Sequence, residues 1–140
     1  PFIDGDDLHP DANIKKMQGG VPLDDADREE WFNAIIHQAG IFLKEGMACV
    51  FACSALKKKY RDKLRGEIDS IRFVYLKASY DRVYQQMAQR KDHFMPVNLL
   101  KNQFETLEVP GSLEPDVLTI EIKDNLPDTV SATIQALGLP

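Results

Sequence analysis

Acidic residues and a histidine crowd into the first nine positions of the chain. Asp4, Asp6 and Asp7 follow the apolar pair Phe2-Ile3 directly, and His9 comes two residues later. Clustered carboxylates suit a hydrated Mg²⁺ ion or a base that takes a proton from a substrate hydroxyl. A turn that caps the next helix also favours Asp, so the pattern alone leaves a functional and a structural role equally open.

A second polar group is cationic. Lys57, Lys58, Lys59 and Arg61 stand at the start of an expected helix, just after the apolar run that ends at Cys53. Free backbone N–H groups at a helix N-terminus attract anions, and cations normally prefer the opposite end. An anionic ligand would compensate these lysines, whereas a solvated basic face is the alternative with equal weight.

Arg28 also lies at the unfavourable end of an expected helix. Its guanidinium could hold a carboxylate with two hydrogen bonds, or it could pair with the neighbouring Asp24 or Asp25. The local pattern favours the ion pair.

Arg90 and His93 fall in a polar break between two expected helices, at 90–96. A segment of this kind can be a mobile lid that brings an arginine onto a phosphate group. On local grounds an ordinary surface connection is favoured.

These candidate groups must be positioned by alternating strands and helices. The hydrophobic patterns predict strands at 2–3, 47–53, 71–76 and 117–122. They predict helices at 10–17, 26–45, 56–65, 80–90, 98–107 and 129–137. The alternation predicts an α/β protein with a mostly parallel sheet, whose ligands bind at the carboxyl ends of the strands. We therefore expect the segments 4–9 and 53–57 to meet at one edge.

Composition limits the class of protein further. The 140 residues carry 17 basic and 22 acidic side chains, for a formal net charge of −5, which argues against general nucleic-acid binding. No apolar run approaches the roughly 20 residues that cross a bilayer, so we expect no membrane span. Cys49 and Cys53 sit too close on one strand to bridge to each other, and we expect reduced thiols in a cytosolic, single-domain protein.

Several blocks together resemble the gluconokinase family, in the family's order and over nearly the whole chain. They are Asp4-Gly5-Asp6, Leu8-His9-Pro10, Asn13, Lys16-Met17, Gly20, Pro22-Leu23, Asp27-Arg28, Trp31, Cys53-Ser54-Ala55-Leu56-Lys57-Lys58, Tyr60-Arg61-Asp62, His93-Phe94-Met95, Gln103-Phe104-Glu105-Thr106-Leu107-Glu108 and Pro110. The resemblance implies a small P-loop carbohydrate kinase, similar to shikimate kinase, with a three-layer fold: a parallel sheet with helices on both faces. It implies transfer of the γ-phosphoryl group of ATP to the 6-hydroxyl of D-gluconate, giving 6-phospho-D-gluconate. Mg²⁺ and a homodimer are implied as well.

The resemblance also assigns roles to residues. Asp6 would orient and deprotonate the substrate hydroxyl, and Asp4 would lie near Mg²⁺ through water. Arg90 would act on the nucleotide phosphates from a lid at 90–110, which includes the helix after it. The side chains implied in substrate binding, besides Asp6, are His9, Arg28, Lys57, Arg61, His93 and Gln103.

One departure from the family is large. The sequence contains no G-x-x-x-x-G-K-[ST] motif, the loop that cradles nucleotide phosphates in this superfamily. We therefore expect an N-terminally truncated domain whose first, central strand, between 47–53 and 71–76, is missing and whose own activity is impaired. The alternatives are a non-catalytic regulatory or dimerising homologue, and a related kinase for another polyol or acid.

Overall fold

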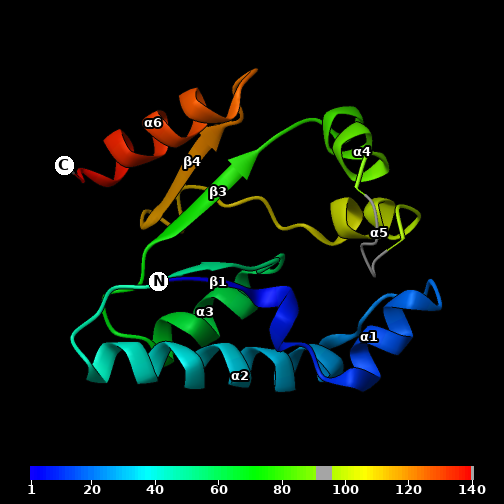
Figure 1. The fold of residues 1–140 in the computed structure, drawn as a ribbon, viewed down its shortest axis with the longest axis horizontal. Helices are drawn as coiled ribbons and strands as arrows, with labels where there is room; N and C mark the ends of the chain where they lie inside the picture. Colours follow the sequence, from blue (N-terminus) through cyan, green and yellow to red (C-terminus); the bar gives the residue numbers. More distant parts are fainter. Residues whose placement is uncertain (91–95, 140) are drawn as a thin grey trace. The chain divides into compact units, whose positions relative to one another are not determined.

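The computed structural model describes residues 1–90 and 96–139 of the chain. The strands are β1 (Phe2–Asp4), β2 (Val50–Ala52), β3 (Phe73–Lys77) and β4 (Val117–Glu121). The helices are η1 (Gly5–Leu8, 3₁₀), α1 (Asp11–Gln18), α2 (Asp25–Lys44), α3 (Lys58–Glu67), α4 (Tyr80–Ala88), α5 (Leu99–Thr106) and α6 (Leu126–Leu137). The chain divides into two compact units, Pro1–Asp69 with Arg90–Glu108 and Ser70–Gln89 with Val109–Pro140. Figure 1 shows the elements of each unit.

The first unit is built around a parallel strand pair. β1 pairs with β2 so that Asp4 lies opposite Ala52, and both strands therefore end at the same level. Figure 1 shows α2 and α3 running along one side of this pair. The core side chains beneath the strands come mainly from these two helices: Trp31, Phe32, Ile35, Ala39, Tyr60 and Leu64.

A close contact fixes the end of β1. Gly5 follows the strand, and a Cβ atom there would lie 2.4 Å from the carbonyl oxygen of Ala52. The indole Nε1 of Trp31 donates a hydrogen bond of 2.6 Å to the carbonyl of Gly5. Only glycine fits here, because any side chain would push the strand ends apart.

Capping explains where α2 begins. Asp24 is the N-cap, and its side chain accepts from the backbone N–H of Asp27 while the Asp27 side chain accepts from the backbone of Asp24. Asn13 of α1 donates to the carbonyl of Asp27 at 2.8 Å, and Lys16 forms an ion pair with the Asp27 carboxylate. The start of α2 is therefore tied to α1.

The second unit holds the other strand pair. β3 and β4 are parallel from Phe73 opposite Val117 to Lys77 opposite Glu121, and α6 packs on β4. α4 begins at Ser79, whose hydroxyl accepts from the N–H of Arg82. α6 ends at Gly138, which has a left-handed φ of 65°.

Most expected elements are confirmed, with three differences. The run 47–53 forms a strand only over Val50–Ala52, and the acidic turn after β1 is a 3₁₀ helix capped by the Asp4 side chain. The last helix begins at Leu126 because Asn125 caps it, earlier than expected. Parallel strands alternate with helices as expected for an α/β protein.

Within the described ranges β2 and β3 belong to different sheets, so they are not paired with each other. The expected further strand between them stays a prediction. Cys49 and Cys53 are free thiols, as expected. No helix in the described part of the chain is both long and apolar enough to cross a membrane.

Candidate functional site

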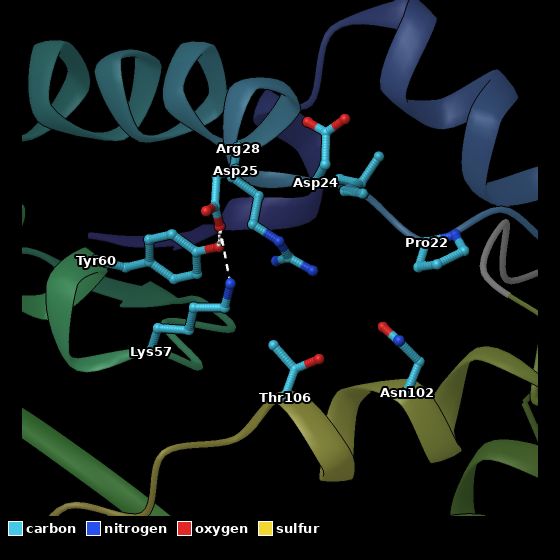
Figure 2. A pocket seen from close by; sticks show the side chains of 9 residues that line it. Pro22, Asp24, Asp25, Arg28, Lys57, Tyr60, Asn102 and Thr106 are labelled. Atoms are coloured by element: carbon cyan, nitrogen blue, oxygen red, sulfur yellow. Dashed lines mark hydrogen bonds and ion pairs between the residues drawn. The ribbon is translucent and has the colours of Figure 1, made fainter.

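A small polar pocket lies in the first unit, between the start of α2, the start of α3 and helix α5. Its volume is about 260 Å³. Figure 2 shows Arg28 reaching from α2 into the space that Lys57, Asn102 and Thr106 border from other sides. The lining residues are Pro22, Leu23, Asp24, Asp25, Arg28, Lys57, Tyr60, Asn102 and Thr106.

Arg28 is the most informative residue of the pocket. It is only 6% exposed, and its guanidinium lies 5.8 Å from the ring centroid of Tyr60. Within residues 1–90 and 96–139 neither Asp24 nor Asp25 pairs with Arg28. The Asp24 carboxylate instead contacts Lys16 and the N–H of Asp27, and the Asp25 carboxylate contacts Lys57 and Lys59 of the α3 start. The favoured ion pair of Arg28 is therefore wrong, and the guanidinium faces the pocket.

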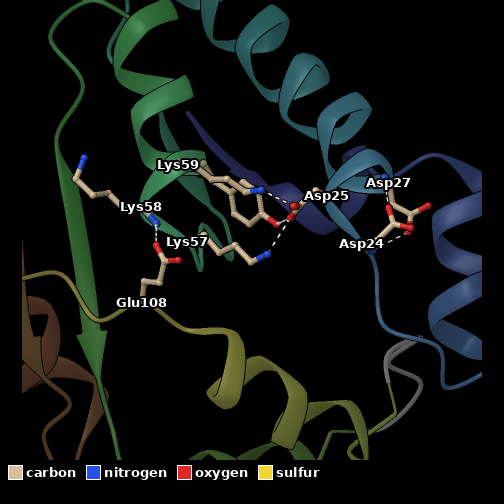
Figure 3. Close-up of polar contacts among 8 residues, drawn as sticks. Asp24, Asp25, Asp27, Lys57, Lys58, Lys59 and Glu108 are labelled. Atoms are coloured by element: carbon tan, nitrogen blue, oxygen red, sulfur yellow. Dashed lines mark hydrogen bonds and ion pairs between the residues drawn. The ribbon is translucent and has the colours of Figure 1, made fainter.

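Asp25 joins α2 to α3 through three donors. The ammonium groups of Lys59 and Lys57 and the hydroxyl of Tyr60 all bond to its carboxylate, Lys57 at 2.9 Å (Figure 3). The bonds from Lys59, Tyr60 and Lys57 hold the pKa of the Asp25 carboxyl well below its usual range. Burial, together with the bond to Asp25, raises the pKa of Tyr60 to about 12, so this hydroxyl stays protonated.

Carboxylates of the protein compensate the lysines at the start of α3: Asp25 bonds to Lys57 and Lys59, and Asp62 pairs with the Lys58 ammonium at 2.7 Å. The Glu108 carboxylate accepts from the backbone N–H of Lys58 at 2.6 Å (Figure 3). Lys57 occupies the N-cap position of α3 and makes no side-chain cap of its own. An anionic ligand is not needed to explain these cations, but the Lys57 ammonium still borders the pocket.

The opposite wall is neutral and polar. Asn102 and Thr106 lie four residues apart on α5, and both point toward the pocket in Figure 2. With Tyr60 they supply an amide and two hydroxyl groups. A guanidinium and an ammonium on one side and neutral polar groups on the other can hold a carboxylate that carries several hydroxyls.

The residues that follow β1 interact electrostatically with Arg28 of the pocket. His9 is buried and stacks on Trp31 with ring centroids 4.2 Å apart, and its Nε2 lies 4.0 Å from Oδ1 of Asp6. Burial and the positive charge of Arg28 lower the pKa of His9 to about 4. Burial and the negative charge of Asp6 raise the pKa of Cys53 to about 12, while Arg28 opposes this shift. The charges of Asp6 and Arg28 therefore both act on the Cys53 thiol, which stays protonated at pH 7.

The structure brings together some of the predicted site residues. Arg28 and Lys57 line the pocket, and Asp6 and His9 lie at the adjoining strand end. Gln103 is not among the lining residues, because its neighbours Asn102 and Thr106 occupy the face of α5 that points there.

Three other predicted residues have different surroundings. The guanidinium of Arg61 is turned to backbone carbonyls, and Arg61 does not line the pocket. Asp4 is exposed, and its carboxylate accepts from the N–H of Asp6 at 3.1 Å, as a helix cap does. Arg90 is exposed, and His93 lies outside the described residues.

Sequence reasoning missed several lining residues. Asp24 and Asp25 were considered as partners of Arg28 and as a helix cap but not as pocket lining, and Tyr60 had no assigned role. A usable signal for the α5 wall was present, since Asn102 and Thr106 are polar residues at the spacing of one helix face.

A metal or nucleotide site is a separate question. In the described part of the chain no three His, Cys, Asp or Glu side chains gather so that they could hold a metal ion. The carboxylates of Asp4 and Asp6 alone do not make such a site, and the sequence has no G-x-x-x-x-G-K-[ST] loop. The described residues therefore do not fit a magnesium–nucleotide complex by themselves.

The fold and the pocket place the chain among small α/β kinases. A gluconokinase from Sinorhizobium meliloti 1021 superposes with a TM-score of 0.84 at 40% identity, over 99% of this chain and 77% of that one. An unliganded sugar kinase from Janibacter sp. HTCC2649 gives a TM-score of 0.85 at 32% identity, over 99% and 79%. No protein-family model matches the chain.

Sequence comparison identifies one family within this class of kinases. The thermoresistant gluconokinase of Escherichia coli (strain K12) is 42% identical over 136 residues, which cover 97% of this chain and 78% of the relative. The gluconokinase of Gluconobacter oxydans (strain 621H) is 45% identical over 114 residues, covering 81% and 64%. The chain belongs to the gluconokinase family, and the expected family and fold class are confirmed.

Proposed function

We propose that the protein phosphorylates the 6-hydroxyl of D-gluconate with ATP. The observation that carries this proposal is the nearly buried guanidinium of Arg28, which faces a polar pocket without a carboxylate partner among the described residues. Membership of the gluconokinase family supports the same reaction. A cation buried in this way is favourable when a substrate carboxylate pairs with it.

The pocket suggests how gluconate is held. Arg28 binds the carboxylate through two N–H donors, and Lys57 adds a second positive charge. Asn102 and Thr106 bond to hydroxyl groups along the sugar chain. Asp25 keeps the ammonium of Lys57 in place, because the two are joined at 2.9 Å.

Proton transfer is assigned to the strand end. In the proposal Asp6 accepts the proton of the 6-hydroxyl on a carboxylate oxygen, so that this oxygen can attack a phosphoryl group. His9, whose Nε2 lies 4.0 Å from Oδ1 of Asp6, is neutral at pH 7 because burial and Arg28 lower its pKa to about 4. ATP supplies the phosphoryl group when it is bound, and Mg²⁺ offsets the charge of its phosphates.

Other parts of the proposal rest on the family resemblance. They are the use of Mg²⁺, action of Arg90 on the phosphates, a contact of His93 with the substrate, and a homodimer. A cytosolic location is proposed from the two cysteines. The two free thiols support a reducing compartment.

Calorimetric titration tests the acceptor site of this chain directly. We expect D-gluconate to bind at least about tenfold more tightly than sorbitol, which has the hydroxyls but no carboxylate. Equal affinities would contradict carboxylate recognition. Tighter binding of another sugar acid would favour a related kinase instead.

Phosphoryl transfer is tested as gluconate-dependent formation of ADP. We compare this chain with one extended at its N-terminus by a segment that carries G-x-x-x-x-G-K-[ST]. The extended chain should turn over much faster because its loop cradles the phosphates. Equal rates would contradict our expectation that this motif is required, and no turnover in either would favour a non-catalytic homologue.

Arg28→Ala tests the residue on which the proposal depends. Loss of a charge-assisted contact should raise the Kd for D-gluconate by about 10- to 100-fold in calorimetry. Arg65→Ala is the matched control and should leave the Kd unchanged, since Arg65 pairs with Asp62 and does not line the pocket. An unaltered Kd in Arg28→Ala would remove Arg28 from the site.

A further inference from the structure

Arg61 is a buried arginine that holds backbone rather than a ligand. It is 4% exposed, and its Nη1 donates to the carbonyls of Ala55 at 2.8 Å and Leu56 at 3.2 Å. Its Nη2 donates to the carbonyl of Glu108 at 2.9 Å. One side chain therefore connects two segments that lie 47 residues apart in sequence.

Glu108 makes the same connection from the other side. Its backbone N–H donates to the carbonyl of Leu56 at 2.9 Å, and its carboxylate accepts from the N–H of Lys58 at 2.6 Å. This carboxylate supplies the N-terminal cap that Lys57 does not provide for α3. Lys57 thus lies between two residues, Leu56 and Lys58, whose backbone groups Glu108 holds.

These bonds join two walls of the pocket. Lys57 and Tyr60 belong to the wall at the start of α3, and Thr106 stands two residues before Glu108 at the end of α5. The Lys57 ammonium borders the pocket (Figure 2), and the backbone on either side of Lys57 is held by Glu108 (Figure 3) and by Arg61. A shift of that backbone would move the ammonium away from the guanidinium of Arg28.

We propose that Glu108, supported by Arg61, is a positioning residue that sets the place of Lys57 in the pocket. Arg61 thereby changes from an expected substrate contact to a support of the pocket wall. The inference rests on the proposed function, because it takes D-gluconate as the ligand whose carboxylate Lys57 meets. Neither Glu108 nor Arg61 touches the substrate in this account.

Binding measurements on Glu108 variants test the inference. Glu108→Ala should raise the Kd for D-gluconate by about tenfold, a change of about 1.4 kcal/mol. Glu108→Gln keeps an oxygen that can accept from Lys58 N–H, and its Kd should stay within about twofold of the unsubstituted protein. Glu105→Ala is the matched control and should leave the Kd unchanged. It also removes one carboxylate, but on α5, where Oε1 of Glu105 lies 3.7 Å from Nζ of Lys101.

A double-mutant cycle with Lys57→Ala separates positioning from a general loss of structure. If Glu108 acts through Lys57, Glu108→Ala should change the Kd by less than about twofold once Lys57 is already Ala. A purely structural role would lower the free energy of unfolding but leave the Kd of the folded protein unchanged. If Glu108→Ala does not fold, Glu108→Asp serves in its place, because its shorter side chain keeps the charge but retreats from Lys58.

The outcomes are distinct. Failure of the unsubstituted protein to bind D-gluconate overturns the proposed function itself. Normal binding by the unsubstituted protein with no effect of Glu108→Ala overturns the positioning role alone. A full tenfold effect in the Lys57→Ala background overturns it as well.

Discussion

Two buried arginines show how much the role of a residue depends on what faces it. Arg28 and Arg61 are 6% and 4% exposed, and both sit in the first turns of a helix. Backbone carbonyls meet the guanidinium of Arg61, whereas a pocket meets that of Arg28. The family resemblance implied that both arginines are substrate ligands, because residue identity alone does not show which carbonyls a folded loop turns inward.

His9 makes a prediction about acid stability at the same scale. The folded protein keeps His9 neutral down to about pH 4, whereas an unfolded chain protonates it near 6.5. The unfolded state therefore binds more protons between these values, and the free energy of unfolding must fall as the pH drops through this window. From pH 7 to pH 5 His9 should account for a loss of about 2 kcal/mol.

Urea unfolding of His9→Asn at both pH values measures this contribution. The variant should lose stability between pH 7 and pH 5 by about 2 kcal/mol less than the unsubstituted protein. His37→Asn, at an exposed position of α2, should keep the full pH dependence. A pH dependence of His9→Asn identical to that of the unsubstituted protein would show that His9 is not held neutral.

At the scale of elements, the junction of β1 with η1 decides where the acidic segment lies. The Gly5 backbone touches the end of β2, and its carbonyl accepts from Trp31 of α2. Three elements thus meet at one glycine. The position of Asp6 relative to the pocket depends on this contact.

Gly5→Ala should therefore be costly. Its Cβ would lie 2.4 Å from the Ala52 carbonyl, and separating the strand ends should lower the free energy of unfolding by about 1–3 kcal/mol in a urea titration. Gly40→Ala is the matched control, because nothing lies within 4 Å of a Cβ there and alanine favours a helix interior by about 0.5–1 kcal/mol. Equal effects of the two substitutions would contradict the close approach at Gly5.

Local patterns predicted the elements better than the pocket. The hydrophobic periodicity and the caps at Asp24 and Ser79 place α2 and α4 within about two residues, since these signals lie within one turn of the chain. Gln103, which the family resemblance implied in substrate binding, does not line the pocket whereas Asn102 does, because one residue turns the side chain by about 100° around a helix. Asp25 bonds to the Lys57 and Lys59 ammonium groups and Glu108 to the Lys58 backbone N–H, and neither contact has a local signal because both carboxylates are distant in sequence.

At the scale of the whole molecule, all the residues that line the pocket belong to the same unit, Pro1–Asp69 with Arg90–Glu108. Parallel strands and family membership follow from the sequence, since they depend on patterns spread over the chain. The division into Pro1–Asp69 with Arg90–Glu108 and the remaining unit could not be predicted, because it depends on contacts between distant segments.

This division predicts where a ligand changes the protein. Saturating D-gluconate should slow amide hydrogen exchange at 24–28, 55–60 and 99–106, where the walls of the pocket lie. Binding stabilises the folded form of these segments against local unfolding. β4 and α6 should exchange at their former rates, and mass spectrometry of peptides from 117–137 is the internal control. Slowing confined to 117–137 would place the ligand elsewhere.

Trp31 has a practical consequence of its own. It is the only tryptophan in the sequence, it is fully buried, and it contacts both His9 and the Gly5 carbonyl. All indole fluorescence of the protein therefore originates at the junction beside the acidic segment. The molecule carries a native optical reporter at this point, and its emission can follow events there without any attached dye.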